Sequence, residues 1–521
     1  MGGDFRIEAL LHPGAYPHEV GRIELVATHV SWVVLTGPYA YKVKKPVRFD
    51  FLDASTLERR AALCAEELRL NHRFAPDIYL DVVPVVRAGE GFKVGGGGPP
   101  VEYALRMRQF DPACCLPELL QREAVTAEDA RQVARMLADI HARSGIAPAG
   151  SDFGRYEDVR RRVLGNIREV ARDGEASLQP ALARIADLAA ARLQRLAPLV
   201  EARRRAGHVR ECHGDLHAAN LVKWRGRWTA FDCLEFDPAL RWIDTLGDLA
   251  FLFMDLLAHG REDLAFEFLS AYEEEAGDYT GLALLPLHVA DRALIRAKVG
   301  LLRAAGAGPE GRPALLAAAG GRIALARRWL EGVPGALVIM HGLAGSGKST
   351  VAAQLVGRIG AVRIRSDVER RRLAGRPALS RRRQGIAEGE YSRDWTQRTY
   401  ARLLRSAQAA LKGGCNVIVD ATFLDASHRE AFRRLARSME ARFLIASCTA
   451  DPQVLRARIR ARASSGTDPS EATVAVLEHQ LRTQHPLADT ELQRTVLFDT
   501  ADRDSTSRAL DSVRALCAGR A

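Results

Sequence analysis

The stretch "HGDLHAAN" at 213–220 places Asp215 five residues before Asn220, and "FDCLEFD" places Asp232 twelve residues further on. Phosphoryl transfer from a magnesium–nucleotide complex needs one carboxylate to orient and deprotonate the accepting hydroxyl, and an amide and another carboxylate to bind the metal. Helix capping explains Asp215 or Asn220 singly, but not the whole set. Asp215, Asn220 and Asp232 together supply the two carboxylates and the amide that such a site needs.

Such a site also needs a lysine on an upstream strand, paired with a glutamate on a helix, to hold the α- and β-phosphates of ATP. The run "YAYKVKK" lies on a predicted strand, and strand alternation puts Lys42 and Lys44 on one face. Glu66 and Glu67 lie on the predicted helix that follows. The neighbouring residues favour Lys42, whereas the choice between the two glutamates stays open.

A second nucleotide-binding motif occurs in "GLAGSGKST" at 342–350, which matches G-x-x-x-x-G-K-[ST] between a predicted strand and a predicted helix. Glycines let backbone N–H groups turn toward phosphates, and the helix N-terminus adds partial positive charge. Lysine reaches the β- and γ-phosphates, and the following serine binds Mg²⁺. The predicted ATP-binding residues are Gly342, Ala344, Gly345, Ser346, Gly347, Lys348, Ser349 and Thr350, with Ser349 also a metal ligand.

Two acidic residues follow predicted strands of the same region, where parallel sheets bind ligands. Asp367 follows "AVRIRS" and is succeeded by Arg370, and Asp420 ends "NVIVD". One of the two aspartates is expected to act on magnesium and the other to accept a proton from a substrate hydroxyl. The residues alone leave open which aspartate takes which role, and a strand-end Asp also serves as an ordinary helix cap.

The segment "LRARIRARASSGT" carries arginines at every second position from 456 to 462. On a helix Arg456 and Arg460 share one face. Such a helix, hinged at "SSGT", is predicted to close over the γ-phosphate and to stabilise charge in the transition state. The alternative is a solvated basic helix in an arginine-rich protein.

Alternation and helical periodicity predict the elements that position these residues. A hairpin is predicted at 22–47, a helix from Ser55 or Thr56 to about 74, and strands at 78–86 and 101–110 around a glycine-rich tip. Helices are predicted from 111 to 330, interrupted by a strand–loop–strand segment at 209–233. Beyond "EGVPG" at 331–335, five strands alternate with helices, which indicates a parallel α/β sheet.

Residues from about 25 to 330 resemble the aminoglycoside phosphotransferase and choline kinase branch of the protein-kinase-like fold, through "HGDLHAAN", "FDCLEFD" and "DTLGDLAFLFMDL". This resemblance implies that Asp215 is the catalytic aspartate, that Asn220 and Asp232 are the Mg²⁺ ligands, and that Asp248 is a structural acid. Residues from 335 onward resemble P-loop kinases of the zeta-toxin and polynucleotide-kinase type, through "GLAGSGKST", "RSDVER" and "VIVDATFLDASHR". There the resemblance implies that Asp367 is the general base, which leaves Asp420 as the metal ligand. It also implies that Arg370 contacts the acceptor and that Asp420, Thr422 and Arg429 line the pocket.

The sequence therefore predicts a multidomain protein. An N-terminal protein-kinase-like α+β part with two lobes, 1–110 and 111–330, is followed by a linker at 331–335 and a C-terminal α/β P-loop kinase domain with a parallel sheet at 336–521. The net charge of +11 favours anionic ligands. Eight cysteines without metal-binding spacing, and no basic, apolar leader at the N-terminus, predict a cytoplasmic protein that does not bind membranes.

The expected function is a bifunctional, ATP- and Mg²⁺-dependent kinase. The C-terminal module would phosphorylate a polynucleotide 5′-hydroxyl or a small metabolite, and the N-terminal module a small molecule. One alternative is that one module is a nucleotide sensor or ATPase that gates the other. Another is an antibiotic-modifying phosphotransferase, although the basic charge of the chain suits a polycationic substrate poorly.

Overall fold

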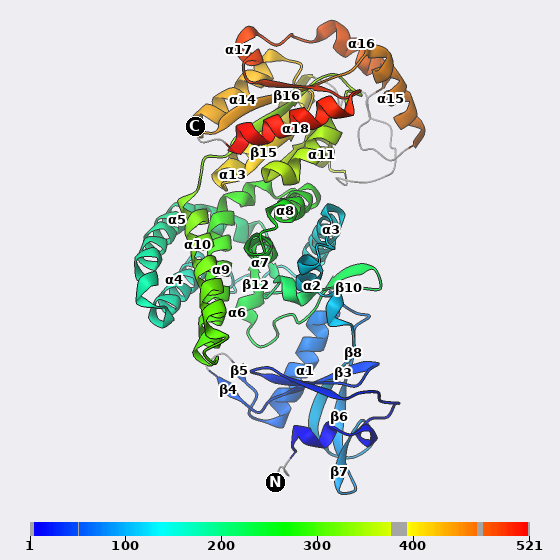
Figure 1. Cartoon of the computed structure of the whole chain (residues 1–521), viewed down its shortest axis with the longest axis vertical. Coiled ribbons are helices and arrows are strands. Elements are labelled where there is room, and N and C mark those ends of the chain that lie inside the picture. Colours follow the sequence, from blue (N-terminus) through cyan, green and yellow to red (C-terminus); the bar gives the residue numbers. More distant parts are fainter. Residues whose placement is uncertain (1–4, 50–51, 377–392, 466–472, 519–521) are drawn as a thin grey trace. The chain divides into compact units, whose positions relative to one another are not determined.

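The computed structural model describes residues 5–49, 52–376, 393–465 and 473–518, and the chain divides into two compact units (Figure 1). The helical stretch predicted at 111–330 is shared between the units, and the predicted domain boundaries stay predictions. Unit 1 comprises Met1–Val125, Asp139–Arg155 and Ala202–Asp248, and unit 2 comprises Thr126–Ala138, Tyr156–Glu201 and Leu249–Ala521.

Unit 1 is built on an antiparallel sheet of six strands in the order β1-β2-β3-β8-β6-β7. The predicted hairpin is present as β2 and β3, and β1 adds a further strand beside it. The glycine-rich tip contains one more strand, β7. The strands are β1 (Glu24–Ala27), β2 (Ser31–Leu35), β3 (Tyr39–Lys44), β6 (Tyr79–Ala88), β7 (Gly91–Val94) and β8 (Pro100–Arg108), with a small ribbon of β4 (Arg48–Phe49) and β5 (Leu52–Asp53).

Helix α1 (Leu57–Asn71) packs against β6 and β8. Its N-cap is Thr56, whose side chain accepts a hydrogen bond from the backbone N–H of Arg59, and not Ser55. Unit 1 also holds the predicted strand–loop–strand segment, which contains β9 (Val209–Glu211), the short helix η5 (Ala218–Asn220), β10 (Leu221–Trp224) and β11 (Arg227–Ala230). The remaining elements here are η1 (Ile7–Leu10), η2 (Pro13–Ala15), η3 (Pro112–Cys114), α2 (Leu116–Gln121), α6 (Pro238–Arg241) and β12 (Trp242–Asp244).

The helical part of unit 2 packs α4 and α10 against α9. Thr126 and Asp129 form a capping box at the start of α3, because they exchange backbone-to-side-chain hydrogen bonds of 3.0 and 3.2 Å. The last residues of α3 and α5 and the first residues of α7 belong to unit 1. The helices are α3 (Ala127–Arg143), α4 (Tyr156–Asp173), η4 (Ala176–Leu178), α5 (Gln179–Arg205), α7 (Thr245–Ala258), α8 (Glu262–Ala276), η6 (Tyr279–Leu284), α9 (Leu285–Ala305) and α10 (Arg312–Glu331).

Unit 2 also contains a parallel sheet in the order β14-β15-β13-β16-β17, so all five predicted strands are confirmed. Helices α11 and α18 pack against each other and share a core with the sheet, and α13 and α14 form a second contacting pair (Figure 1). The elements are β13 (Ala336–His341), α11 (Lys348–Ile359), β14 (Ala361–Arg365), α12 (Ser366–Leu373), α13 (Arg393–Lys412), β15 (Asn416–Asp420), α14 (Ala426–Ser438), β16 (Arg442–Thr449), α15 (Pro452–Ser465), α16 (Val474–Thr483), α17 (Asp489–Leu492), β17 (Thr495–Asp499) and α18 (Arg503–Ala518).

Candidate nucleotide-binding sites

A buried carboxylate in unit 1 holds two lysine side chains. Glu67 of α1 is fully buried, and its Oε1 and Oε2 lie 2.7 Å from Nζ of Lys42 and 2.6 Å from Nζ of Lys44. Both lysines extend from the same face of β3, as the alternation predicts. Glu66 instead pairs with Arg69 at 2.7 Å and is partly exposed. Of the two candidate glutamates, Glu67 is therefore the one that contacts the lysines.

The two lysines differ in their second partner. Nζ of Lys42 lies 2.5 Å from Oδ1 of Asp232, whereas Lys44 forms an ion pair with Glu235. Burial alone would raise the pKa of Asp232, but the ammonium of Lys42 outweighs it and holds that pKa at about 2. Lys42 thus links the helix glutamate to the predicted metal ligand, the arrangement expected of a phosphate-binding lysine. Sequence reasoning missed Glu235, three residues after Asp232 in the same "FDCLEFD".

The backbone at Asp232 has a conformation that few non-glycine residues adopt. Its φ is +62°, in the left-handed region. Its N–H donates to the Tyr79 hydroxyl at 3.0 Å, and the N–H of Cys233 donates to Oδ1 of Asn71 at 3.0 Å. These bonds stabilise a backbone conformation that costs of order 1 kcal/mol. Residues in such unfavourable conformations often occur at functional sites. They direct the carboxylate of Asp232 toward Lys42.

The loop before β10 brings Asp215 and Asn220 together. Nδ2 of Asn220 donates to the backbone oxygen of Asp215 at 2.9 Å, so the amide oxygen is the atom that remains to bind a cation. Oδ2 of Asp215 lies 3.5 Å from Nε2 of His217. Burial would raise the pKa of Asp215, but the hydrogen bond and charge of His217 lower it below its usual range. The Asp215 carboxylate is therefore ionised at neutral pH.

A fully buried carboxylate anchors the start of this loop. Asp248 accepts hydrogen bonds from the backbone N–H groups of His213 at 3.0 Å and Gly214 at 2.8 Å, and lies 3.1 Å from Nε2 of His141. The contacts agree with the structural role that the family resemblance implies for Asp248.

Asp232 and Asn220 offer the half-exposed carboxylate and the amide oxygen that Mg²⁺ takes as ligands, so the donor set fits the metal.

The phosphate-binding loop of unit 2 requires its glycines. Gly342, Gly345 and Gly347 have φ of +135°, +80° and +82°. A Cβ on Gly342 would lie 2.3 Å from the backbone oxygen of Cys448, far inside contact distance. The loop leads into α11, and Nζ of Lys348 turns back to donate to the backbone oxygen of Leu343 at 2.7 Å. This is the strand–loop–helix arrangement predicted for phosphate binding.

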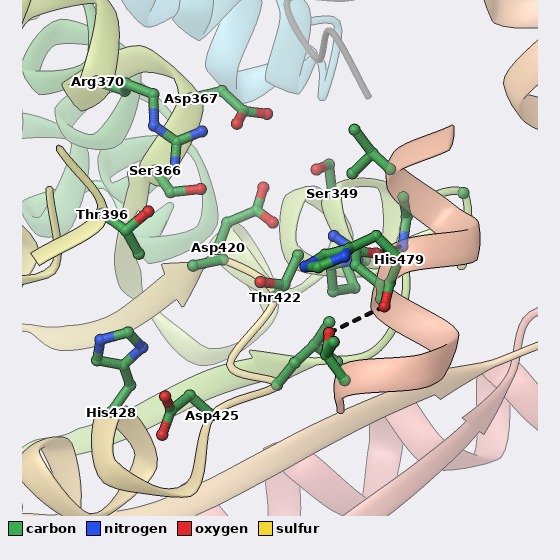
Figure 2. A pocket seen from close by; sticks show the side chains of 18 of the residues that line it. Ser349, Ser366, Asp367, Arg370, Thr396, Asp420, Thr422, Asp425, His428 and His479 are labelled. Atoms are coloured by element: carbon green, nitrogen blue, oxygen red, sulfur yellow. Dashed lines mark hydrogen bonds between the residues drawn. The ribbon is translucent and has the colours of Figure 1, made fainter. Parts of the chain in front are cut away.

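A cavity of about 820 Å³ opens in front of this loop and brings most of the predicted unit 2 residues together. In Figure 2, Asp367 and Arg370 extend from α12, and Asp420 and Thr422 extend from the end of β15. Gly342 and Ser346 shape the loop without being among the lining residues. The predicted residues that line the cavity are Ala344, Gly345, Gly347, Lys348, Ser349, Thr350, Asp367, Arg370, Asp420 and Thr422.

Asp420 has the property expected of a metal ligand. Its Oδ2 is buried and has no hydrogen-bond partner among the described residues, and Nε of Arg365 lies 4.0 Å away. Leaving a buried carboxylate oxygen without a partner is unfavourable. Mg²⁺ binds through one or two carboxylates together with phosphates and waters. Asp420 and Ser349, both on the cavity wall, fit such an ion.

The structure changes the assignment of the arginines. Arg458 lines the cavity and donates to Oγ1 and O of Thr500 at 2.8 and 2.9 Å, whereas Arg456 pairs with Glu478 and Arg460 is exposed. The helical face shared by Arg456 and Arg460 is therefore not the face at the cavity, because Ile459 and Leu455 fix the helix rotation by packing inward. Of the predicted hinge at 464–467, Ser464 and Ser465 belong to α15, and 466–467 lie outside the described residues.

Arg429 was also expected in the pocket and is instead buried beside it. It is 1% exposed, pairs with Glu491 at 2.7 Å, and donates to backbone oxygens of Phe423 and Pro486. These contacts tie the start of α14 to the segment before α17, so Arg429 is structural. Glu491 lies 62 residues from Arg429 along the chain, so the local sequence gives no sign of this partner.

One wall of the cavity was missed by sequence reasoning. The rings of Tyr400 and His428 stack with centroids 3.7 Å apart and planes inclined by 9°. Asp425 and Thr396 line the same cavity, and Figure 2 places Asp425 and His428 away from Asp367 and Arg370. These residues come from α13 and α14, so only the tertiary structure brings them together.

Comparison with known proteins places the chain in a family. It is 31% identical over 456 residues to the Mycobacterium tuberculosis protein named "Uncharacterized protein Rv2004c", across 87% of this chain and 89% of that protein. The Mycobacterium bovis protein Mb2027c matches with the same identity and coverage. This chain belongs to the Rv2004c family. A family model described as "AAA domain" matches residues 337–487 of this member of the family.

Solved structures resemble the two parts of this family member separately. A choline kinase from Cryptosporidium parvum shares 10% identity, covers 62% of this chain and 95% of its own, and gives a TM-score of 0.39. Kti12 from Chaetomium thermophilum, in complex with ADP-AlF3, shares 17% identity, covers 35% of this chain and 100% of its own, and gives a TM-score of 0.28.

The fold predictions are confirmed by the elements themselves. The N-terminal part combines an antiparallel sheet with helices, as the predicted α+β class requires, and the C-terminal part has the predicted parallel sheet, with the AAA-domain model matching residues 337–487. In the part of the chain that the structure describes, no helix is both long and apolar enough to cross a membrane. The cytoplasmic location stays a prediction.

Proposed function

We propose that the chain is an ATP- and Mg²⁺-dependent phosphotransferase with a separate nucleotide site in each unit. The observation that carries this proposal is that each unit gathers a phosphate-binding lysine and acidic residues for base and metal. Lys42 contacts Asp232 in unit 1, and one cavity in unit 2 is lined by Lys348, Asp367 and Asp420. Each unit contains its own lysine and its own carboxylates, so neither site needs residues from the other unit.

In unit 2, Lys348 binds the β- and γ-phosphates, and the backbone N–H groups of the glycine-rich loop bind the remaining phosphate oxygens. Ser349 and Asp420 hold Mg²⁺, which neutralises phosphate charge when bound. The carboxylate of Asp367 accepts the proton of the acceptor hydroxyl, and Arg370 positions the acceptor. Arg458, which lines the same cavity, is placed to stabilise charge on the transferred group.

In unit 1, Lys42 binds the α- and β-phosphates, and Glu67 fixes the position of its ammonium. Asn220 and Asp232 hold the metal. Asp215 accepts the proton of the acceptor hydroxyl, which its lowered pKa allows because the carboxylate is ionised at neutral pH. The acceptor of this unit is a small hydroxylated molecule.

The acceptor of unit 2 is a small hydroxyl-rich metabolite. A volume of about 820 Å³ accommodates a nucleotide and a small second substrate. Beyond the P-loop, Thr396, Asp425 and His428 offer hydrogen-bonding groups that suit hydroxyls. The carboxylate of Asp425, which lines the cavity together with Thr396 and His428, would repel the phosphates of a polynucleotide. A 5′-hydroxyl oligonucleotide as acceptor is the competing outcome of the test.

The test measures transfer of γ-labelled phosphate from ATP to sugars, nucleosides, amino alcohols, aminoglycosides and 5′-hydroxyl oligonucleotides. Wild type is compared with Lys348→Ala and Asp215→Ala. We expect label on a small hydroxylated acceptor that disappears with only one of the two variants, which assigns that acceptor to one unit. Label that appears only on water would refute the two-kinase proposal for these acceptors and leave a nucleotide-sensing ATPase.

A further inference from the structure

Within unit 2, the end of helix α8 contacts the strand that leads to Asp367. Glu274 of α8 is 8% exposed and binds two arginines of β14, with Oε2 2.9 Å from Nη2 of Arg363 and Oε1 2.7 Å from Nη1 of Arg365. The Ser270 hydroxyl accepts a hydrogen bond from the backbone N–H of Arg363 at 3.0 Å. The strand is thus attached to α8 through both backbone and side chains.

Arg365 lies between Glu274 and the predicted metal ligand. It is the register partner of Asp420 in the adjacent strand, and its Nε lies 4.0 Å from Oδ2 of Asp420. That oxygen has no hydrogen-bond partner among the described residues. The guanidinium therefore makes its short contact with Glu274 and stays at a longer distance from Asp420.

Helix α12, which carries Asp367 and Arg370, has a second attachment to α8. Arg372 donates to the backbone oxygens of Glu274 and Glu275, two carbonyls at the C-terminal end of α8. The approach depends on Gly277, because a Cβ there would lie 2.6 Å from Nε of Arg372. Because α8 is bonded to both β14 and α12, the position of Asp367 and Arg370 depends on this helix.

We propose that Glu274 is a positioning residue of the unit 2 site: it holds the Arg365 guanidinium away from Asp420 and so leaves Asp420 able to bind the metal of the nucleotide. This inference rests on the function proposed above for the unit 2 site.

The physical reason is competition for one buried carboxylate. A buried guanidinium requires a charged partner, and the described ion pairs of Arg365 are those with Glu274 and Asp420. Without the charge of Glu274, Arg365 moves toward Asp420 and opposes metal binding. Shortening one charge–charge distance from about 4 to about 3 Å at an effective dielectric constant of about 20 weakens metal binding by about tenfold.

The test uses the full chain with Asp232→Asn, so that the metal site of unit 1 is impaired in every sample. Binding of Mn²⁺ in the presence of ADP is followed by electron paramagnetic resonance for Glu274→Gln, Arg365→Gln and the double variant. The matched control is Glu267→Gln, on the same helix, where the carboxylate pairs with Arg131 at 2.7 Å. ADP affinity without metal is measured for each.

We expect about tenfold weaker Mn²⁺ binding in Glu274→Gln, unchanged ADP affinity without metal, and recovery in the double variant. Arg365→Gln alone should bind Mn²⁺ at least as well as the parent, because it removes a positive charge near Asp420. Weaker Mn²⁺ binding in Arg365→Gln, or no recovery in the double variant, would overturn the inference even if Glu274→Gln folds poorly. Absence of phosphate transfer by wild type would instead count against the proposed function, since Mn²⁺ binding is measured without turnover.

Discussion

Replacing Asp248 with Asn removes a buried charge from the loop that carries Asp215 while nearly preserving side-chain volume. Asp248 is 0% exposed and accepts hydrogen bonds from the backbone N–H groups of His213 and Gly214. Asparagine can accept with one oxygen but presents an NH₂ group to the second donor. The change therefore leaves at least one buried N–H without an acceptor, beside His141.

The pKa of Asp248 gives the size of the effect. Burial alone would raise it, but the hydrogen bond and charge of His141 and the nearby His213 hold it at about 2. Compared with an ordinary value of about 4, and at about 1.4 kcal/mol per pKa unit, the native environment favours the charged form by about 2 to 3 kcal/mol. This agrees with the cost of about 1 to 3 kcal/mol for one unsatisfied buried hydrogen-bonding group.

Hydrogen–deuterium exchange of the peptide containing 213–214 measures this loss locally. We expect the two amides in Asp248→Asn to exchange about 30- to 150-fold faster, the factor equivalent to the free energy above. Asp237→Asn is the control: Asp237 caps α6 through the N–H of Ala239 at 2.8 Å, and its replacement should leave exchange at 213–214 unchanged.

The sign of the pH dependence provides an independent check. Because the pKa of Asp248 is lowered on folding, its stabilisation is present above its unfolded pKa of about 4 and is lost as the pH falls toward about 2. Wild-type protection of these amides, corrected for intrinsic exchange, should decrease across that range more than protection in Asp248→Asn. A change in exchange below about threefold, or the same acid dependence in both proteins, would refute this reasoning.

Two further predictions concern the nucleotide sites themselves. Glu67→Gln breaks a buried ion pair and should lower the free energy of unfolding of unit 1 by about 3 to 5 kcal/mol. It should also weaken ADP binding, measured calorimetrically in a Lys348→Ala background. A similar loss of stability and ADP affinity in the control Glu66→Gln would contradict the assignment of Glu67 as the partner of the lysines. Gly342→Ala should abolish nucleotide binding in unit 2, because the new Cβ would lie 2.3 Å from the backbone oxygen of Cys448. Binding is followed with a fluorescent ATP analogue. If the variant still binds the analogue at unit 2, the loop does not need this glycine.

In unit 1, the local sequence pattern predicted that a lysine of the strand contacts a glutamate of the helix. It did not show which of the two glutamates makes the contact. Alternation placed Lys42 and Lys44 on one face, and the helix offered Glu66 and Glu67. The choice followed from how α1 rotates against β6 and β8, which turns Glu67 inward between the lysines. That rotation is set by the packing of the whole helix, so neighbouring residues in sequence do not reveal it.

In unit 2, phosphate binding by the loop from Gly342 to Thr350 could be predicted from the sequence, because it depends on consecutive backbone groups and one side chain. The arginines were not. Arg456 and Arg460 share a helical face, yet the burial of Leu455 and Ile459 turns Arg458 toward the cavity. Arg429 was expected at the substrate and instead satisfies a buried ion pair with Glu491.

The sequence by itself determined the two kinds of fold, the order of the five parallel strands along the chain, and the short motifs whose groups lie within a few residues of one another. Their spacing sets their geometry, because backbone connectivity limits how far such groups can separate. Tertiary structure decided the contacts between distant segments: Lys42 with Asp232, the wall formed by Tyr400 and His428, and the attachment of Arg365 to Glu274. These contacts depend on how buried faces pack and how buried charges find partners, and both are properties of the folded chain as a whole.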